Sequence, residues 1–196
     1  MLLLGVTGGI GSGKTEVCKI FKKLGAKILD ADEIAKNIID GNPEVKEQIV
    51  DYFGKDILNK EGTINKKVLA AKAFSDEESI DVLNSIVHPF VLDELDRWVS
   101  ELSKEYDLII IDAPLIFESG LDKKLDYTIT VQTSLKKRLD RVLKTGKFSR
   151  EEIMQRMEYQ MSEEQKAELA DFVINNNSTL EQLENRVKEI YNKLNM

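Results

Sequence analysis

The chain has 196 residues, of which 42% are hydrophobic and 32% are charged, and its net charge is −7. This balance excludes collagen-like, low-complexity and wholly disordered chains, and the acidic charge indicates no basic face for nucleic acid. The apolar runs are far shorter than the ~20 residues that span a bilayer. The single cysteine, Cys18, excludes an internal disulfide and suits a reducing compartment. We expect a cytoplasmic protein of one domain, a monomer or a weak homo-oligomer, without membrane or nucleic-acid partners.

The first thirty residues are predicted to form a strand, a helix and a second strand. Residues 1–6 are an apolar run, and residues 15–24 repeat apolar side chains at helical spacing. Gly25 stands where a glycine commonly ends a helix, and residues 26–29 form another short apolar run. A strand, helix and strand within this length indicate a βαβ unit, so a parallel sheet is expected.

Helices are predicted to dominate the next seventy residues. Helical spacing of apolar residues recurs in the segments 33–39, 44–53, 66–74 and 77–87. Pro89 is expected to end the last of these helices, because proline lacks an N–H and clashes with the preceding turn. A fifth helix is then expected at residues 90–102.

The remaining elements complete a three-layer α/β domain. Residues 107–112 hold four consecutive apolar residues between two aspartates, which is typical of a central strand. Two further strands are predicted at 127–132 and 172–174, and helices at 135–166, with a soft break at Thr145–Gly146, and 179–194. We therefore expect a five-stranded parallel sheet, with helical insertions after the second and fourth strands.

The segment Gly8–Thr15 fits the phosphate-loop pattern G-x-x-x-x-G-K-[ST] and lies between a predicted strand and a predicted helix. Glycines allow the backbone to turn its N–H groups onto phosphate oxygens, and the helix N-terminus adds further donors. Lys14 is expected to bridge the β- and γ-phosphates, and the Thr15 hydroxyl to bind Mg²⁺. The alternative is a glycine-rich turn that binds nothing.

Carboxylates follow two of the predicted strands. Asp112 ends the strand at 107–112 and resembles a Walker B aspartate that binds Mg²⁺. The alternative is that it is only a turn residue at the end of a strand. Asp30 and Asp32 follow the second strand, at the sheet edge where parallel sheets bind ligands. One of these two could accept the proton of an attacking hydroxyl, or could merely cap the next helix.

The phosphate loop alone does not name a reaction, because kinases, GTPases, motors and switches share it. No Asn-Lys pair is followed by aspartate two residues later, which argues against guanine binding. Arg138 and Arg141 could neutralise charge on a transferring phosphoryl group, or could simply be solvated on a helix face. A nucleotide-dependent switch and a kinase of a small acceptor are therefore both open at this point.

Six tracts, in order along nearly the whole chain, resemble the dephospho-coenzyme A kinase family. The specific ones are the phosphate loop and the Asp-Ala-Asp tract some fifteen residues after its lysine. The full set is Thr7–Thr15, Asp30–Asp32, Val87–Pro89, Pro114–Glu118, Gln160 and Ala170–Asn177. The resemblance implies a P-loop kinase that transfers the γ-phosphoryl group of ATP to the ribose 3′-hydroxyl of 3′-dephospho-coenzyme A. A kinase of another small acceptor, such as a nucleoside monophosphate or shikimate, is the alternative.

The resemblance also implies roles for individual residues and segments. It makes Asp32 the catalytic base and places His88, Pro114 and Leu115 near the acceptor. It assigns nucleotide contacts to Gly11, Ser12, Gly13, Lys14, Thr15 and Glu16. It implies a core of residues 1–32, 106–134 and 170–196, a coenzyme A-binding insert at 33–105 and a lid at 135–169.

The expected lid departs from the family pattern at one position. The family usually has two arginines four residues apart after a leucine, and Arg138 fits the first place. Val142 occupies the second place, and Arg141 stands one residue early. Which of these arginines, or of Lys144 and Arg150, contacts the transferred group is therefore open. His88 likewise has two readings, a helix-end cap or an acceptor contact.

Overall fold

A computed structural model describes residues 1–194, which divide into two compact units. One unit holds residues 1–30 together with the chain from Val99 onward, and the other spans Ala31–Trp98. Each unit has its own buried apolar side chains. The insert expected at residues 33–105 overlaps the second unit, and its role in binding an acceptor stays a prediction.

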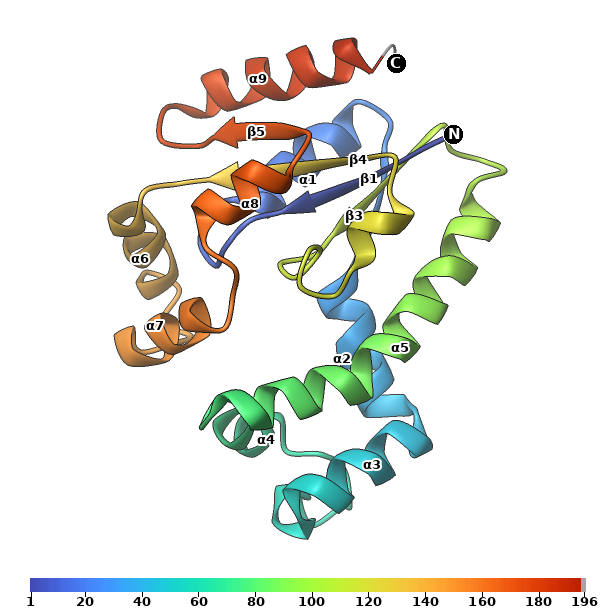
Figure 1. The fold of residues 1–196 in the computed structure, drawn as a ribbon, viewed down its shortest axis with the longest axis vertical. Helices are drawn as coiled ribbons and strands as arrows, with labels where there is room; N and C mark the ends of the chain where they lie inside the picture. Colours follow the sequence, from blue (N-terminus) through green and yellow to red (C-terminus); the bar gives the residue numbers. More distant parts are fainter. Residues whose placement is uncertain (195–196) are drawn as a thin grey trace. The chain divides into compact units, whose positions relative to one another are not determined.

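The first unit is built on one five-stranded sheet in which every neighbouring pair is parallel (Figure 1). Its order is β2-β3-β1-β4-β5, so the predicted parallel sheet is confirmed. The strand bounds are β1 Leu2–Thr7, β2 Lys27–Asp30, β3 Leu108–Asp112, β4 Tyr127–Gln132 and β5 Phe172–Asn175. In this register Val6 and Asp30 both pair with Asp112, so three strands end at one edge.

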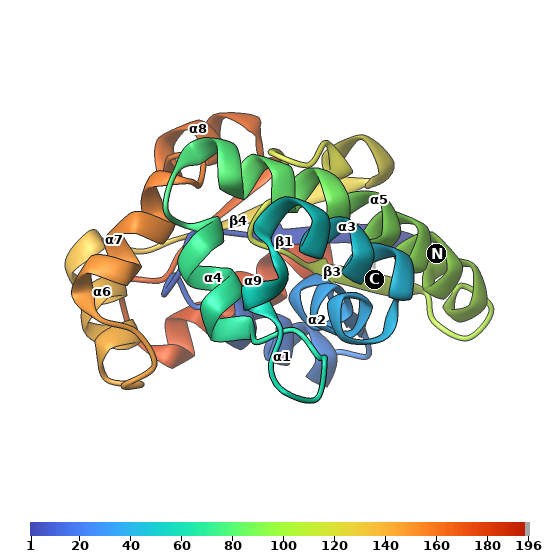
Figure 2. The same cartoon turned by 90° about the horizontal axis from the view of Figure 1, so that it is seen from below.

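Helices cover both faces of this sheet, as Figure 2 shows from below. Helices α1 (Lys14–Lys23) and α9 (Leu180–Lys193) lie on one face, and α8 (Glu163–Leu169) lies on the other against β4. Buried side chains of α1, α9 and four strands form the main core, among them Val17, Phe21, Ile110, Val131 and Val187. Gly25 adopts a φ of 100° just after α1, which confirms the predicted helix end.

The predicted helix at 135–166 is three helices, α6 (Leu135–Leu143), α7 (Arg150–Glu158) and α8. The first break confirms the expected interruption near Gly146, whose φ is 65°. The second break, between α7 and α8, was not expected. Ser162 starts α8 there by accepting the N–H of Gln165, while the Gln165 side chain accepts the N–H of Ser162.

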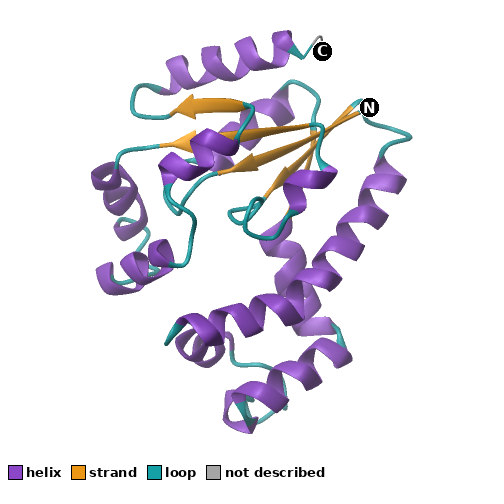
Figure 3. Ribbon diagram, in the orientation of Figure 1, coloured by secondary structure: helices purple, strands orange, loops and turns teal. Residues whose placement is uncertain are grey.

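The second unit consists of helices, shown with the rest of the chain in Figure 3. They are α2 Ala31–Gly41, α3 Pro43–Phe53, the 3₁₀ turn Lys55–Ile57, α4 Lys66–Ala73 and most of α5 Glu77–Leu102. Asn42 and Asn65 begin α3 and α4 by accepting two backbone N–H groups each.

The prediction that Pro89 ends a helix was wrong, because α5 runs through it as one helix of 26 residues. Val87 and Val91 are buried on either side, so packing outweighs the loss of one backbone hydrogen bond. His88 therefore stands inside a helix, and its reading as a helix-end cap was wrong as well. Neither α5 nor any other helix in residues 1–194 is long and apolar enough to cross a membrane.

Candidate active site

The predicted phosphate loop connects β1 to α1 at the carboxyl edge of the sheet. Gly8, Gly11 and Gly13 have φ values of 144°, 80° and 98°, a backbone region that L side chains rarely adopt. The loop borders a cavity of about 250 Å³ that is also lined by Lys14, Thr15 and Arg141. The loop therefore has both the curvature and the open space that a bound phosphate chain needs.

In the second half of the loop, Gly11–Thr15, the carbonyl groups of Gly11 and Ser12 accept hydrogen bonds from neighbouring side chains. Arg141 donates to the carbonyls of Gly11 at 3.3 Å and Ser12 at 3.1 Å. The Ser12 carbonyl also accepts from Thr133 Oγ1 at 2.8 Å and from Asn176 Nδ2 at 2.9 Å. These contacts occupy the two carbonyls and hold their peptide planes in one orientation.

Most N–H groups of this half are free, although that of Ser12 donates to the Gly9 carbonyl at 3.0 Å. Within residues 1–194, no protein acceptor takes the N–H groups of Gly11, Gly13, Lys14 or Thr15. Free backbone donors at the start of α1, where the helix dipole is positive, form a binding site for an anion. These free N–H groups are the feature that most directly indicates phosphate binding by the loop.

Lys14 and Asp112 form an ion pair beside the loop, with 3.3 Å between Lys14 Nζ and Asp112 Oδ1. Asp112 ends β3 and is 9% exposed, and its Oδ1 makes no hydrogen bond of normal geometry. Thr15, the other predicted metal ligand, is exposed at the start of α1. The two expected Mg²⁺ ligands thus flank the lysine, and one of them has coordination capacity to spare.

The first half of the loop is contacted by side chains from the predicted lid. Glu163 Oε1 accepts the Gly9 N–H at 2.9 Å, and Gln160 Oε1 accepts the Ile10 N–H at 3.3 Å. Arg138 Nε donates to the Ile10 carbonyl at 2.9 Å and its guanidinium lies 3.3 Å from Glu163 Oε1. We call Arg138, Gln160 and Glu163 the lid contact group.

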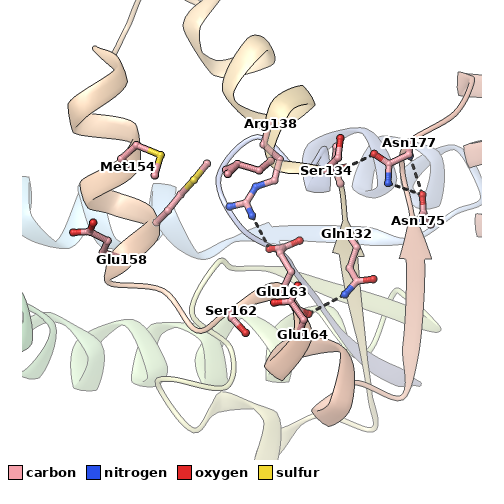
Figure 4. A pocket seen from close by; sticks show the side chains of 13 residues that line it. Gln132, Ser134, Arg138, Met154, Glu158, Ser162, Glu163, Glu164, Asn175 and Asn177 are labelled. Atoms are coloured by element: carbon pink, nitrogen blue, oxygen red, sulfur yellow. Dashed lines mark hydrogen bonds and ion pairs between the residues drawn. The ribbon is translucent and has the colours of Figure 1, made fainter.

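The two predicted lid arginines face different cavities. Arg141 lines the cavity of the phosphate loop, whereas Arg138 lines one of about 480 Å³ bordered by α6, α7, α8 and the ends of β4 and β5. Figure 4 shows this second cavity, with the Arg138 guanidinium directed at Glu163 and Gln132 holding the start of α8. The arginine that departs from the family pattern, Arg141, is thus the one at the phosphate cavity.

Lys166 is a buried cation that sequence reasoning missed. Its side chain is 0% exposed, lies 2.9 Å from Glu118 Oε1 and donates to the carbonyl of Pro114. Burial lowers the pKa of Lys166, and the carboxylate of Glu118 opposes that shift only in part. The Pro114 carbonyl also accepts from Thr7 Oγ1 at 3.1 Å. Lys166 therefore fixes the loop that follows Asp112 and carries the predicted acceptor contacts Pro114 and Leu115.

The remaining predicted residues lie in different parts of the chain. Glu16 lines a neighbouring cavity of about 320 Å³ together with Arg141 and Asn176. Asp32 stands in the first turn of α2 and His88 stands in α5. Both residues belong to the second unit. Their roles toward an acceptor stay predictions.

Comparison with known proteins identifies the family. A sequence profile described as Dephospho-CoA kinase matches residues 2–182. The chain belongs to the dephospho-CoA kinase family. It is 38% identical to the dephospho-CoA kinase of Carboxydothermus hydrogenoformans over 97% of this chain and 93% of that protein.

Two solved structures are similar to the chain over nearly its whole length. The crystal structure of TT1252 from Thermus thermophilus superposes with a TM-score of 0.82 at 33% identity, covering 98% of this chain and 97% of that one. Dephospho-CoA kinase from Campylobacter jejuni superposes with a TM-score of 0.71 at 30% identity, covering 99% and 98%. The expected P-loop kinase fold is confirmed.

Proposed function

We propose that the chain phosphorylates the ribose 3′-hydroxyl of dephospho-CoA with ATP, the last step of coenzyme A synthesis. The free N–H groups of the loop, together with membership of the family, support this proposal. A kinase of another small acceptor is not favoured by these matches. A cytoplasmic location suits both the single buried cysteine and this pathway step.

The β- and γ-phosphates of ATP are proposed to bind on the free N–H groups of Gly11, Gly13, Lys14 and Thr15, with Lys14 as the principal cation. Arg141 lines the same cavity and adds positive charge next to the loop. Since phosphoryl transfer proceeds through a loose transition state, catalysis depends on placing the phosphates and neutralising their charge. The loop performs the first task, and the two cations perform the second.

The residues beside Lys14 fit a Mg²⁺ ion. The described residues hold no group of three or more carboxylate, histidine or cysteine side chains suited to a metal. Mg²⁺ needs no such cage, because it keeps several waters and binds through one or two protein oxygens and the substrate phosphates. Thr15 and Asp112 would hold it, and Asp112 Oδ1 has no hydrogen bond to give up. When bound, Mg²⁺ neutralises charge on the phosphate oxygens.

Asp32 is the proposed catalytic base, on the strength of the Asp-Ala-Asp tract. Its carboxylate would take the proton of the acceptor 3′-hydroxyl while that oxygen bonds to the γ-phosphorus and the bond to the β-phosphate oxygen breaks, releasing ADP. His88, Pro114 and Leu115 are proposed acceptor contacts. Because water competes with the acceptor, the lid at residues 135–169 is proposed to exclude it during transfer.

Release of ADP with and without dephospho-CoA tests the proposal directly. We expect release to depend on dephospho-CoA, and AMP, CMP or shikimate at the same concentration to support little. Asp32→Asn should keep its affinity for ATP and lose most of kcat, with Asp40→Asn as a surface control. Equal turnover of another acceptor would overturn the substrate assignment, and wild-type kcat in Asp32→Asn would remove Asp32 as the base.

A further inference from the structure

The lid contact group holds the backbone of two consecutive loop residues on three sides. Glu163 and Gln160 accept the N–H groups of Gly9 and Ile10, and Arg138 donates to the Ile10 carbonyl. The Ile10 side chain packs against a small apolar cluster of α6 and α7, formed by Leu139, Val142 and Ile153. The first half of the loop is therefore attached to the lid helices through main chain and side chain alike.

Gly9 is a glycine for a reason that differs from its neighbours. Its φ lies outside the left-handed region, so the backbone alone would accept other residues. A Cβ placed there would stand 2.1 Å from Arg138 Nη2 and 2.7 Å from Glu163 Oε1. The missing side chain therefore makes room for the Arg138–Glu163 ion pair directly above the loop.

The ion pair is retained at a cost in local stability. Arg138 is 7% exposed and the side chain of Glu163 is 15% exposed, so both charges have lost most of their water. Glu163 Oε2 is buried and has no hydrogen-bond partner among the described residues. An apolar pair would avoid both penalties, and such local conflicts occur chiefly at functional positions.

We propose that Glu163 is a positioning residue for ATP. Glu163 fixes the first half of the loop, because it holds the Arg138 guanidinium and accepts the Gly9 N–H. The Ser12 N–H donates to the Gly9 carbonyl at 3.0 Å, and this bond links the second half of the loop to the first. The free N–H groups of Gly11, Gly13, Lys14 and Thr15 are then preorganised for phosphate before ATP arrives. Glu163 does not line the cavity of the phosphate loop and would act through the loop backbone, and the inference rests on the proposed ATP-dependent function.

Glu163→Gln tests this with minimal change of shape. The amide oxygen can still accept the Gly9 N–H, but the neutral side chain no longer attracts Arg138. We expect KM for ATP to rise about tenfold, KM for dephospho-CoA to stay within about twofold, and affinity for a non-hydrolysable ATP analogue to fall with KM. Glu164→Gln, the next residue of α8 with an exposed side chain, is the matched control and should keep all constants.

Gly9→Ala keeps the test decisive if Glu163→Gln folds poorly, and a double variant tests the coupling of Glu163 with Arg138 if it folds well. Gly9→Ala displaces the Arg138 guanidinium without altering any charge, and should raise KM for ATP in the same selective way. In an Arg138→Met background, Glu163→Gln should add less than about twofold, because the two residues act as one unit. Equal changes in both KM values, or additive effects of the two substitutions, would overturn the proposal.

The analogue-binding measurement separates this inference from the proposed function. It needs no acceptor, so a failure of dephospho-CoA to stimulate ADP release would count against the substrate and leave the ATP result standing. Unchanged analogue affinity in both Glu163→Gln and Gly9→Ala would reject Glu163 as a positioning residue even if the kinase activity is confirmed.

Discussion

The two halves of the phosphate loop differ in whether their main-chain N–H groups are already bound to side chains. In the first half, the N–H groups of Gly9 and Ile10 are already bound, by Glu163 of α8 and by Gln160 between α7 and α8. In the second half, the carbonyls of Gly11 and Ser12 are bound, and within residues 1–194 the N–H groups of Gly11, Gly13, Lys14 and Thr15 have no protein acceptor. Only the second half can therefore offer main-chain donors to a phosphate.

This difference shows how one short loop combines attachment with binding. A loop whose N–H groups were all free would lack a fixed geometry, and a loop whose N–H groups were all bound could hold no anion. Arg138 and Arg141, three residues apart on α6, contact one half each. A single helix thereby fixes both halves relative to one another.

Loss of the lysine in the second half should have the largest effect. Lys14→Ala removes the cation closest to the free N–H groups and leaves Asp112 without its partner at 3.3 Å. We expect kcat/KM for ATP to fall by about 10²–10³, the usual cost of removing one group that stabilises transition-state charge. Steady-state kinetics measure this, with Lys22→Ala on the exposed side of α1 as the control. Activity near that of wild type would mean that the loop does not hold the transferred phosphate.

The loop after Asp112 resembles the first half of the phosphate loop in being held by a side chain of α8, here that of Lys166. Lys166→Met leaves the Pro114 carbonyl and Glu118 without their cation, and should lower the free energy of unfolding by about 3 kcal/mol. Urea unfolding measures this. The double variant Lys166→Met with Glu118→Gln should recover part of the loss, and full additivity would show that the two residues are independent.

The same lysine gives a prediction about pH. Burial holds the pKa of Lys166 below its usual value, so the unfolded chain binds this proton more tightly than the folded chain does. Stability contributed by the residue must then rise with pH between the lowered pKa and the unfolded value of about 10.4. We expect the difference in unfolding free energy between wild type and Lys166→Met to grow as pH enters that window. A difference that shrinks there would contradict the lowered pKa.

Two glycines with nearly the same backbone angle sharpen the comparison further. Gly13 and Gly25 have φ values of 98° and 100°, so alanine strains both by about 1–2 kcal/mol. A Cβ at Gly13 would stand 2.2 Å from Asn176 Nδ2, whereas nothing lies within 4 Å of one at Gly25. Gly13→Ala should raise KM for ATP by at least about tenfold, and Gly25→Ala should only lower the melting temperature. Equal kinetic effects would show that strain alone, and not the Asn176 contact, sets the geometry of the second half.

What the sequence predicted well is local in the chain. Most of the strands follow from short apolar runs and the one at Tyr127–Gln132 from alternation, and the phosphate loop follows from glycine spacing beside Lys14 and Thr15. The Lys14–Asp112 pair could also be anticipated, because both residues stand at the carboxyl edge of neighbouring parallel strands. These features depend on periodicity and on strand direction, which a single sequence reveals.

What the sequence did not predict depends on contacts between distant residues. Glu163 and Gly9 are separated by 154 positions, and an acidic residue in the first turn of a helix has an ordinary explanation in the helix dipole. Lys166 looks like a solvated charge among neighbours such as Glu164 and Gln165. The prediction that Pro89 ends a helix was wrong for the opposite reason, because packing of the flanking valines outweighs the local preference of proline.

The smallest expected effect concerns the helix that follows the second half of the loop. Cys18 lies one turn after Lys14 and is 4% exposed, and burial raises the pKa of its thiol. Because the thiolate is the reactive form, a thiol reagent at neutral pH should modify the native protein far more slowly than the protein in urea. Adding ATP should slow the reaction further if it stabilises α1, and Lys14→Ala should remove that protection. Rapid modification of the native protein would mean that α1 opens readily. The free N–H groups at its start would then lack the fixed geometry that phosphate binding by the second half of the loop requires.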